Sequence, residues 1–219
     1  MSPVITITLP PPPFCEREAL RYAGCGTAEE ETRQAILACY TAIQDELIYK
    51  VCYRELPVKI TGQVCDFDTF SVTSQNLADT LAGCNAILLM AATVGVGLDR
   101  YIARFGRISP SRALLFQAIG TERIEALCDA FCQQYSQQNQ VGLRPRFSPG
   151  YGDLPLETQR QIFALLDCPR QLGLCLNDSL LMSPSKSVTA IVGITAQSVT
   201  EHHKCKRCQN TACPFRSNV

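Results

Sequence analysis

The chain has 219 residues, of which 46% are hydrophobic, 18% charged and 7% aromatic, with 20 basic and 20 acidic side chains. This length and composition predict one globular domain with a full hydrophobic core, which needs no disulfides for its stability. A formal net charge of zero argues against a nucleic acid or an anionic membrane as partner. The longest nearly uncharged apolar stretch, residues 86–98, is shorter than the ~20 residues of a membrane-spanning helix.

Thirteen cysteines are spread through the sequence. The N-terminus has neither a basic segment nor a long apolar segment, so we expect no secretory signal and a cytoplasmic protein. In a reducing compartment, cysteines are small buried hydrophobes, catalytic thiols or metal ligands. We expect the ten cysteines that precede residue 200 to pack in the core.

Turn residues and hydrophobic patterns divide the first half of the chain into short elements. Pro10–Pro13 must be extended, so residues 1–15 are expected to be an arm outside the core. The remaining elements expected here are a strand at 4–9 within this arm, helices at 16–23 and from Thr27 to about 50, two strands within 51–64, a helix at 74–81 capped by Ser74, and a buried strand at 86–94.

Longer helices follow in the second half. Ser109-Pro110 predicts the start of a long helix that runs to about residue 138, with Gly120 as a weak point. Beyond a loop at 144–152, we expect an amphipathic helix at 156–166 and strands at 174–181 and 187–195. Helices and strands do not alternate regularly. The fold class predicted is therefore α+β with a largely antiparallel sheet.

Several kinds of chemistry are excluded by the residues present. The two histidines, His202 and His203, are adjacent near the C-terminus, so a Ser-His-Asp or Cys-His arrangement in the main domain has no base. Neither a G-x-x-x-x-G-K-[ST] phosphate loop nor an H-E-x-x-H zinc helix occurs. Gly95 and Gly97 match the first two glycines of the G-x-G-x-x-G dinucleotide-binding motif, but Arg100 occupies the position of the third. We expect a tight strand-to-helix turn there.

The most informative motif is R-F-S-P-G-Y-G at residues 146–152. Pro149-Gly150 predicts a type II turn, whose outward backbone amides and carbonyls can meet the edge of a ligand. Arg146 offers a planar fork that can clamp a carboxylate, and Tyr151 offers an aromatic face for a cation or a base. The alternative, from these residues alone, is a loop turn with a surface arginine and a packed tyrosine.

This motif resembles the R-x-x-x-G-Y motif of the S-adenosylmethionine-binding activation domain of cobalamin-dependent methionine synthase. The similarity extends to DLPLETQRQIFALLD, to S-P-S-K-S-V-T and to the CKRCQNTACPFR ending, and covers nearly the whole chain after residue 15. It is greatest to stand-alone forms of the domain. The resemblance implies an activation domain over residues 16–197, followed by a Cys-rich tail over 198–219.

The resemblance also implies the residues of a ligand site. Arg146 would hold the carboxylate of S-adenosylmethionine, the backbone of Ser148, Pro149 and Gly150 would lie along the adenine, and Tyr151 would complete the site. The sequence departs from the fused family member at Gly152, where that protein has proline. Glu125 is a candidate acidic neighbour, but we expect an ordinary exposed helical glutamate. The stretch 183–187 would add hydroxyls and a cation, or form a polar turn.

A second pattern of side chains lies in the tail. Cys205, Cys208 and Cys213 supply three thiolates at metal-binding spacing. His202 or His203 could complete a zinc site, and three thiolates could instead hold an iron–sulfur cluster. Reduced thiols in a mobile tail are the third interpretation.

The function implied by the resemblance is reductive reactivation of the cobalamin cofactor of methionine synthase or a related corrinoid methyltransferase. A partner protein would present the cobalamin, since no D-x-H-x-x-G cobalt-ligating motif occurs, and a flavodoxin or ferredoxin would donate the electron. Orientation of the ligand suffices for this role, so no catalytic acid or base is expected. Two alternatives stay open, an S-adenosylmethionine-binding sensor module and a metal-binding interaction protein.

Overall fold

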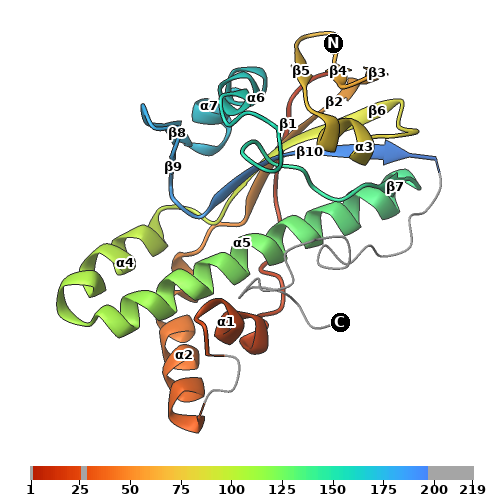
Figure 1. The fold of residues 1–219 in the computed structure, drawn as a ribbon. Coiled ribbons are helices and arrows are strands. Elements are labelled where there is room, and N and C mark those ends of the chain that lie inside the picture. The colour runs from red at the N-terminus through yellow and green to blue at the C-terminus, as the bar shows by residue number, and fades with distance from the viewer. Residues whose placement is uncertain (1, 26–28, 197–219) are drawn as a thin grey trace.

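The computed structural model describes residues 2–25 and 29–196 (Figure 1). Within these residues, the main sheet has five strands in the order β1-β2-β6-β10-β7, and every pairing is antiparallel. The predicted α+β class with a largely antiparallel sheet is thus confirmed. The strands are β1 (Ile5–Thr8), β2 (Lys50–Pro57), β6 (Ala86–Thr93), β7 (Gly142–Leu143) and β10 (Ser187–Thr195).

One face of this sheet is covered by the longer helices, as Figure 1 shows below the sheet. Alternate residues of the central strands, such as Met90 and Val192, pack against Ile119 and Leu127 of the longest helix. The helices on this face are α1 (Glu16–Tyr22), α2 (Glu30–Ile43), α4 (Gly97–Ile108) and α5 (Pro110–Asn139).

The opposite face carries shorter elements. Leu89 and Ile191 of the sheet belong to a second core with Leu77, Ile162 and Leu166. Its helices are α3 (Gln75–Thr80), α6 (Thr158–Leu166) and α7 (Cys168–Leu172), with a small sheet of β3 (Lys59–Thr61), β4 (Val64–Asp66) and β5 (Ser71–Thr73) and a hairpin of β8 (Cys175–Leu176) and β9 (Met182–Ser183).

Two expected elements differ from the structure. The helix expected to reach residue 50 ends at Ile43, and the 3-10 turn η1 (Gln44–Glu46) leads into β2, because Lys50 pairs with both Thr8 and Thr93. Of the strand expected at 174–181, only β8 forms; a turn in which Leu180 has a positive φ of 63° follows it and leads to β9, which pairs with β8. Thr27, predicted to cap the helix, lies outside the described residues.

The N-terminal segment, expected to lie outside the core, contributes β1 to the main sheet. Prolines 12 and 13 have no backbone N–H, but their carbonyl oxygens accept hydrogen bonds of 2.6 and 2.7 Å from the guanidinium of Arg123. Arg123 is fully buried and also pairs with Glu122 of α5. This buried ion pair holds the proline segment against the long helix.

Helix α5 is continuous through Gly120, so the predicted weak point is not a break. The glycine allows a close approach instead. A Cβ at this position would collide with Cδ2 of Leu98 and would lie 2.8 Å from Cγ of Lys186. Gly120 therefore lets α4 and the segment before β10 pack directly on α5. In the described part of the chain, no helix is long and apolar enough to cross a membrane.

Candidate functional site

The R-F-S-P-G-Y-G segment leaves the end of β7 and crosses the edge of β10. Phe147 and Ile191 exchange backbone hydrogen bonds of 2.9 and 2.8 Å, which fix the segment to the sheet. The N–H of Tyr151 then donates to the carbonyl of Ser148 at 3.1 Å, and Gly150 has a φ of +86°. These features match the turn predicted at Pro149-Gly150 and explain why glycine stands at its second central position.

The far end of the turn is tied to helix α3. The carboxylate of Asp153 accepts hydrogen bonds from the hydroxyl of Ser74 and from the backbone N–H groups of Gln75, at 2.7 Å, and Asn76, at 3.3 Å. The hydrogen bond from Ser74, together with those from the two amides, lowers the pKa of Asp153. Gly152 has a φ of +55° and packs on Asn76, where a Cβ would collide. The turn is thus held at both ends.

Part of the edge of β10 beside this turn has no partner strand among the described residues. On this edge, the backbone of Ile191 forms hydrogen bonds with the backbone of Phe147, and the carbonyl of Gly193 accepts one from the N–H of Arg144. Because backbone groups alternate along an antiparallel strand, Ser187 and Thr189 direct their N–H and C=O groups to the same edge. Among the residues that the structure describes, no strand pairs with β10 on that side between residues 187 and 190. These groups are available to a ligand.

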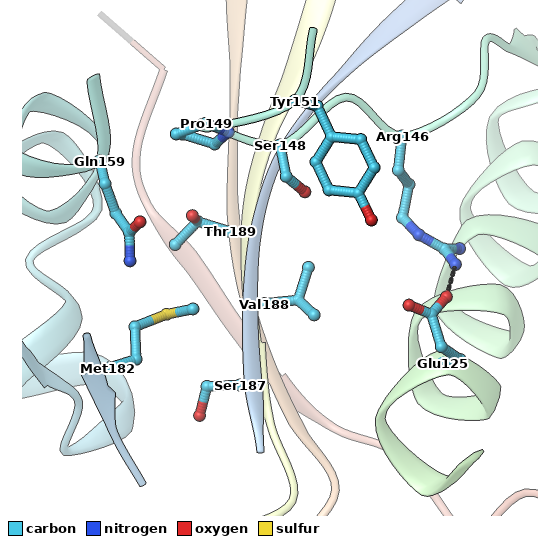
Figure 2. Close-up of a pocket in the computed structure, with 10 residues that line it drawn as sticks. All are labelled: Glu125, Arg146, Ser148, Pro149, Tyr151, Gln159, Met182, Ser187, Val188 and Thr189. Carbon is cyan, nitrogen blue, oxygen red and sulfur yellow. Dashed lines mark hydrogen bonds and ion pairs between the residues drawn. The ribbon is translucent and has the colours of Figure 1, made fainter. Parts of the chain in front are cut away.

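A cavity of about 230 Å³ lies along this open edge (Figure 2). Helix α5 and Arg146 form one end of it, and helix α6 with β9 forms the other, as the close-up shows. Its lining residues are Glu125, Arg146, Ser148, Pro149, Tyr151, Gln159, Met182, Ser187, Val188 and Thr189. Four of the five residues predicted from the motif therefore lie on one cavity, and the fifth, Gly150, forms the turn above it.

Arg146 is fixed before any ligand is present. Its side chain is 8% exposed, and its two terminal nitrogens contact Glu125 at 2.6 Å and Asp129 at 2.5 Å. Burial by itself would lower the pKa of Arg146, but the nearby acidic groups outweigh it and raise the pKa, so the guanidinium stays charged. Glu125 is paired and lines the cavity. The expectation of an ordinary exposed glutamate there is wrong.

The other end of the cavity was missed in the sequence. Gln159 is 4% exposed, and its side chain makes no hydrogen bond with any described residue. Figure 2 shows its amide directed from α6 toward the side of β10 that carries Thr189. A signal existed, because Gln159 shares the buried face of the amphipathic helix with Ile162 and Phe163. A polar side chain on such a face marks either a buried partner or a ligand.

The stretch 183–187 contributes to the cavity only through its last residue. Ser187 lines the cavity, and its hydroxyl donates to Thr93 at 2.8 Å. Lys186 points to α5 instead, where its Nζ donates to Thr121 at 3.1 Å. The ammonium group of Lys186, expected beside the cavity, therefore contacts α5 instead.

The predicted metal ligands Cys205, Cys208 and Cys213 lie outside the described residues, as do both histidines. Within 2–25 and 29–196, no group of three or more His, Cys, Asp or Glu side chains could hold a metal ion. Of the ten cysteines in those ranges, six are buried, which agrees with a packing role, whereas Cys15 and Cys175 are exposed.

Fold and cavity define an α+β domain with a candidate ligand site along an open sheet edge. A family model described as "Vitamin B12 dependent methionine synthase, activation domain" matches residues 71–213, about two thirds of the chain. The chain belongs to this family. The match includes the whole R-F-S-P-G-Y-G motif and the three tail cysteines.

Among solved structures, one described as "Crystal Structure of the MetH Reactivation Domain bound to AdoHcy" has the same fold. Its TM-score is 0.62 at 14% sequence identity, over 91% of this chain and 80% of that one. No curated protein matches the chain significantly.

Proposed function

We propose that this chain binds S-adenosylmethionine in the cavity beside β10 and orients it for reductive remethylation of a cobalamin that a partner protein presents. The observation that carries the proposal is the combination, within a member of the activation-domain family, of a fixed guanidinium and an open strand edge on one cavity. The ligand would supply the methyl group and be left as S-adenosylhomocysteine, and the partner's corrinoid would accept that group after one-electron reduction by a flavodoxin or ferredoxin.

The charges at the Arg146 end suit the amino-acid part of this ligand. Arg146 retains N–H groups beyond those bonded to Glu125 and Asp129, and a ligand carboxylate would accept from them. The two carboxylates give this end a net negative charge, which favours the ammonium and sulfonium groups of the same molecule. A ligand that carries both signs of charge fits this arrangement better than a simple anion.

The nucleoside part would follow the turn and the strand. Ser148 and Pro149 of the turn border the cavity on one side, and Ser187 and Thr189, whose backbone N–H and C=O groups point to the open edge, border it on another. Tyr151 is 69% exposed, so its ring can close over a ligand without leaving a packed position. These groups position the ligand and require no acid or base from the protein.

Exposed side chains near the cavity support the proposal that a partner protein supplies the corrinoid. Tyr151 is exposed there, and Leu181, beside the lining residue Met182, is 64% exposed. Exposed apolar side chains in or next to the cavity lining are suited to be covered in a complex. A methionine synthase or another corrinoid protein would bring its cofactor to this opening.

The test is transfer of a labelled methyl group. A cobalamin-binding methionine synthase with oxidised corrinoid is mixed with a flavodoxin or ferredoxin as one-electron donor and methyl-labelled S-adenosylmethionine, with and without this chain. We expect the label on the corrinoid when the chain is present, and at least tenfold slower transfer with Tyr151→Ala. Ligand binding with no acceleration on any corrinoid protein would contradict the proposal and favour a sensor module.

A further inference from the structure

Gln159 combines three properties that structural side chains rarely share. It is 4% exposed, its carboxamide has no hydrogen-bond partner among the described residues, and it lines the cavity. Most of the side chain is covered by its neighbours, but its carboxamide faces the cavity. Its donor and its acceptor are therefore free to meet a molecule that enters the cavity.

The position of Gln159 separates its role from that of Arg146. Charged groups gather at the α5 end of the cavity, where Arg146 meets Glu125. The end formed by α6 is uncharged, and Figure 2 shows Gln159 there next to Pro149, with Met182 below it. If the amino-acid part of S-adenosylmethionine occupies the charged end, its nucleobase lies toward the uncharged end.

We infer that the amide of Gln159 recognises the adenine, by accepting from its 6-amino group and donating to the adjacent ring nitrogen. A carboxamide carries a donor and an acceptor side by side, which matches this donor–acceptor pair on the base. The thioether of Met182 supplies an adaptable apolar contact for the ring. This inference rests on the proposed function and names the residue that selects the base.

The experiment compares two ligands on four proteins by calorimetry. The ligands are S-adenosylhomocysteine and its purine analogue without the 6-amino group, and the proteins are the wild type, Gln159→Leu, Gln159→Glu and Gln161→Leu. Gln161 is the matched control, because it lies on the same helix but is exposed and lines a different hollow. Circular dichroism checks that each variant is folded.

We expect the wild type and Gln161→Leu to bind the adenine compound about tenfold more tightly than the analogue. In Gln159→Leu that ratio falls to about one, since neither ligand has an amide to meet. In Gln159→Glu both ligands bind more weakly, but the ratio stays near tenfold, because the carboxylate still accepts from the amino group.

An unchanged ratio in a folded Gln159→Leu variant would overturn the inference while leaving the proposed function intact. Failure of the wild type to bind either ligand at millimolar concentration would instead overturn the proposed function, and the inference with it.

Discussion

At the scale of single residues, Arg146 is notable because two carboxylates one helical turn apart hold its guanidinium before a ligand arrives. Because the guanidinium of Arg146 is already held in place, its side chain loses little conformational entropy when a ligand binds. Both carboxylates compete with a ligand carboxylate for the same cation. The site should therefore favour ligands that bring positive charge as well.

S-adenosylmethionine carries one more positive charge than S-adenosylhomocysteine. Among the residues that line the cavity, Glu125 is the acidic one. Two unit charges ~4 Å apart interact by about 1 kcal/mol in water and about 4 kcal/mol at an effective dielectric constant of 20. We predict that Glu125→Gln lowers the ratio of the two affinities by about fivefold. Competition binding measures the ratio, and Glu31→Gln on exposed α2 serves as the control. An unchanged ratio would place the sulfonium away from Glu125.

Cys128 lies on α5 behind Arg146 and is completely buried. Burial raises the pKa of its thiol to about 12, so almost no thiolate exists at neutral pH. We predict that iodoacetamide modifies the exposed Cys15 and Cys175 in the native protein but leaves Cys128 intact until the chain unfolds. Peptide mass spectrometry resolves the three sites. Alkylation of Cys128 as fast as Cys175 would contradict its buried, protonated state.

At the scale of elements, two helical glycines offer a matched comparison. Helix propensity alone predicts that Gly→Ala stabilises a helix by about 1 kcal/mol. Gly106 in α4 has open space around its Cβ position, so Gly106→Ala should raise the free energy of unfolding by about 0.4–1 kcal/mol. Gly120→Ala should lower it by about 1–3 kcal/mol, because the methyl group meets Leu98 and Lys186. Urea denaturation measures both, and stabilisation by Gly120→Ala would show that the α4–α5 contact is loose.

Helix α3 and the site turn share one polar junction. Ser74 caps α3 by accepting from the N–H of Leu77 at 3.0 Å and donating to Asp153. Ser74→Ala should therefore cost about 1 kcal/mol of stability. The folded pKa of Asp153 is lowered, so its contribution is present above the unfolded pKa of about 3.9 and is lost as the pH falls through the folded pKa.

We predict that Asp153→Asn makes the melting temperature less dependent on pH as the pH falls below about 4. Scanning calorimetry of the wild type, Asp153→Asn and the exposed control Asp178→Asn tests this. Equal pH dependence in all three proteins would mean that Asp153 does not tie the turn to α3.

At the scale of the whole molecule, local signals predicted the elements that local chemistry controls. Ser74, the β-branched run of β10 and the Pro149-Gly150 turn were all readable, because caps, strand propensity and turn conformation depend on neighbouring residues. The sheet role of β1 and the close approach at Gly120 were not readable. Both depend on contacts between segments that are distant in sequence.

The same distinction between local signals and distant contacts applies to the candidate site. The motif supplied one end of the cavity, since Arg146, Ser148, Pro149 and Tyr151 are consecutive or nearly so. The other end comes from α6 and β9, and the pairing of Arg146 with Glu125 spans 21 positions. The folded chain brings these groups together from α5, α6, β9 and β10, which are far apart in sequence.

The central claim is that Arg146 anchors S-adenosylmethionine in this cavity. The direct measurement is calorimetric titration of S-adenosylmethionine into the intact chain, beside Arg146→Ala and the exposed control Arg160→Ala, with folding verified by circular dichroism. Loss of a buried carboxylate clamp costs about 2–5 kcal/mol, which is enough to remove a micromolar signal. We predict binding by the wild type and Arg160→Ala and none by Arg146→Ala. Equal binding by all three proteins, or none by the wild type at millimolar ligand, would contradict the claim.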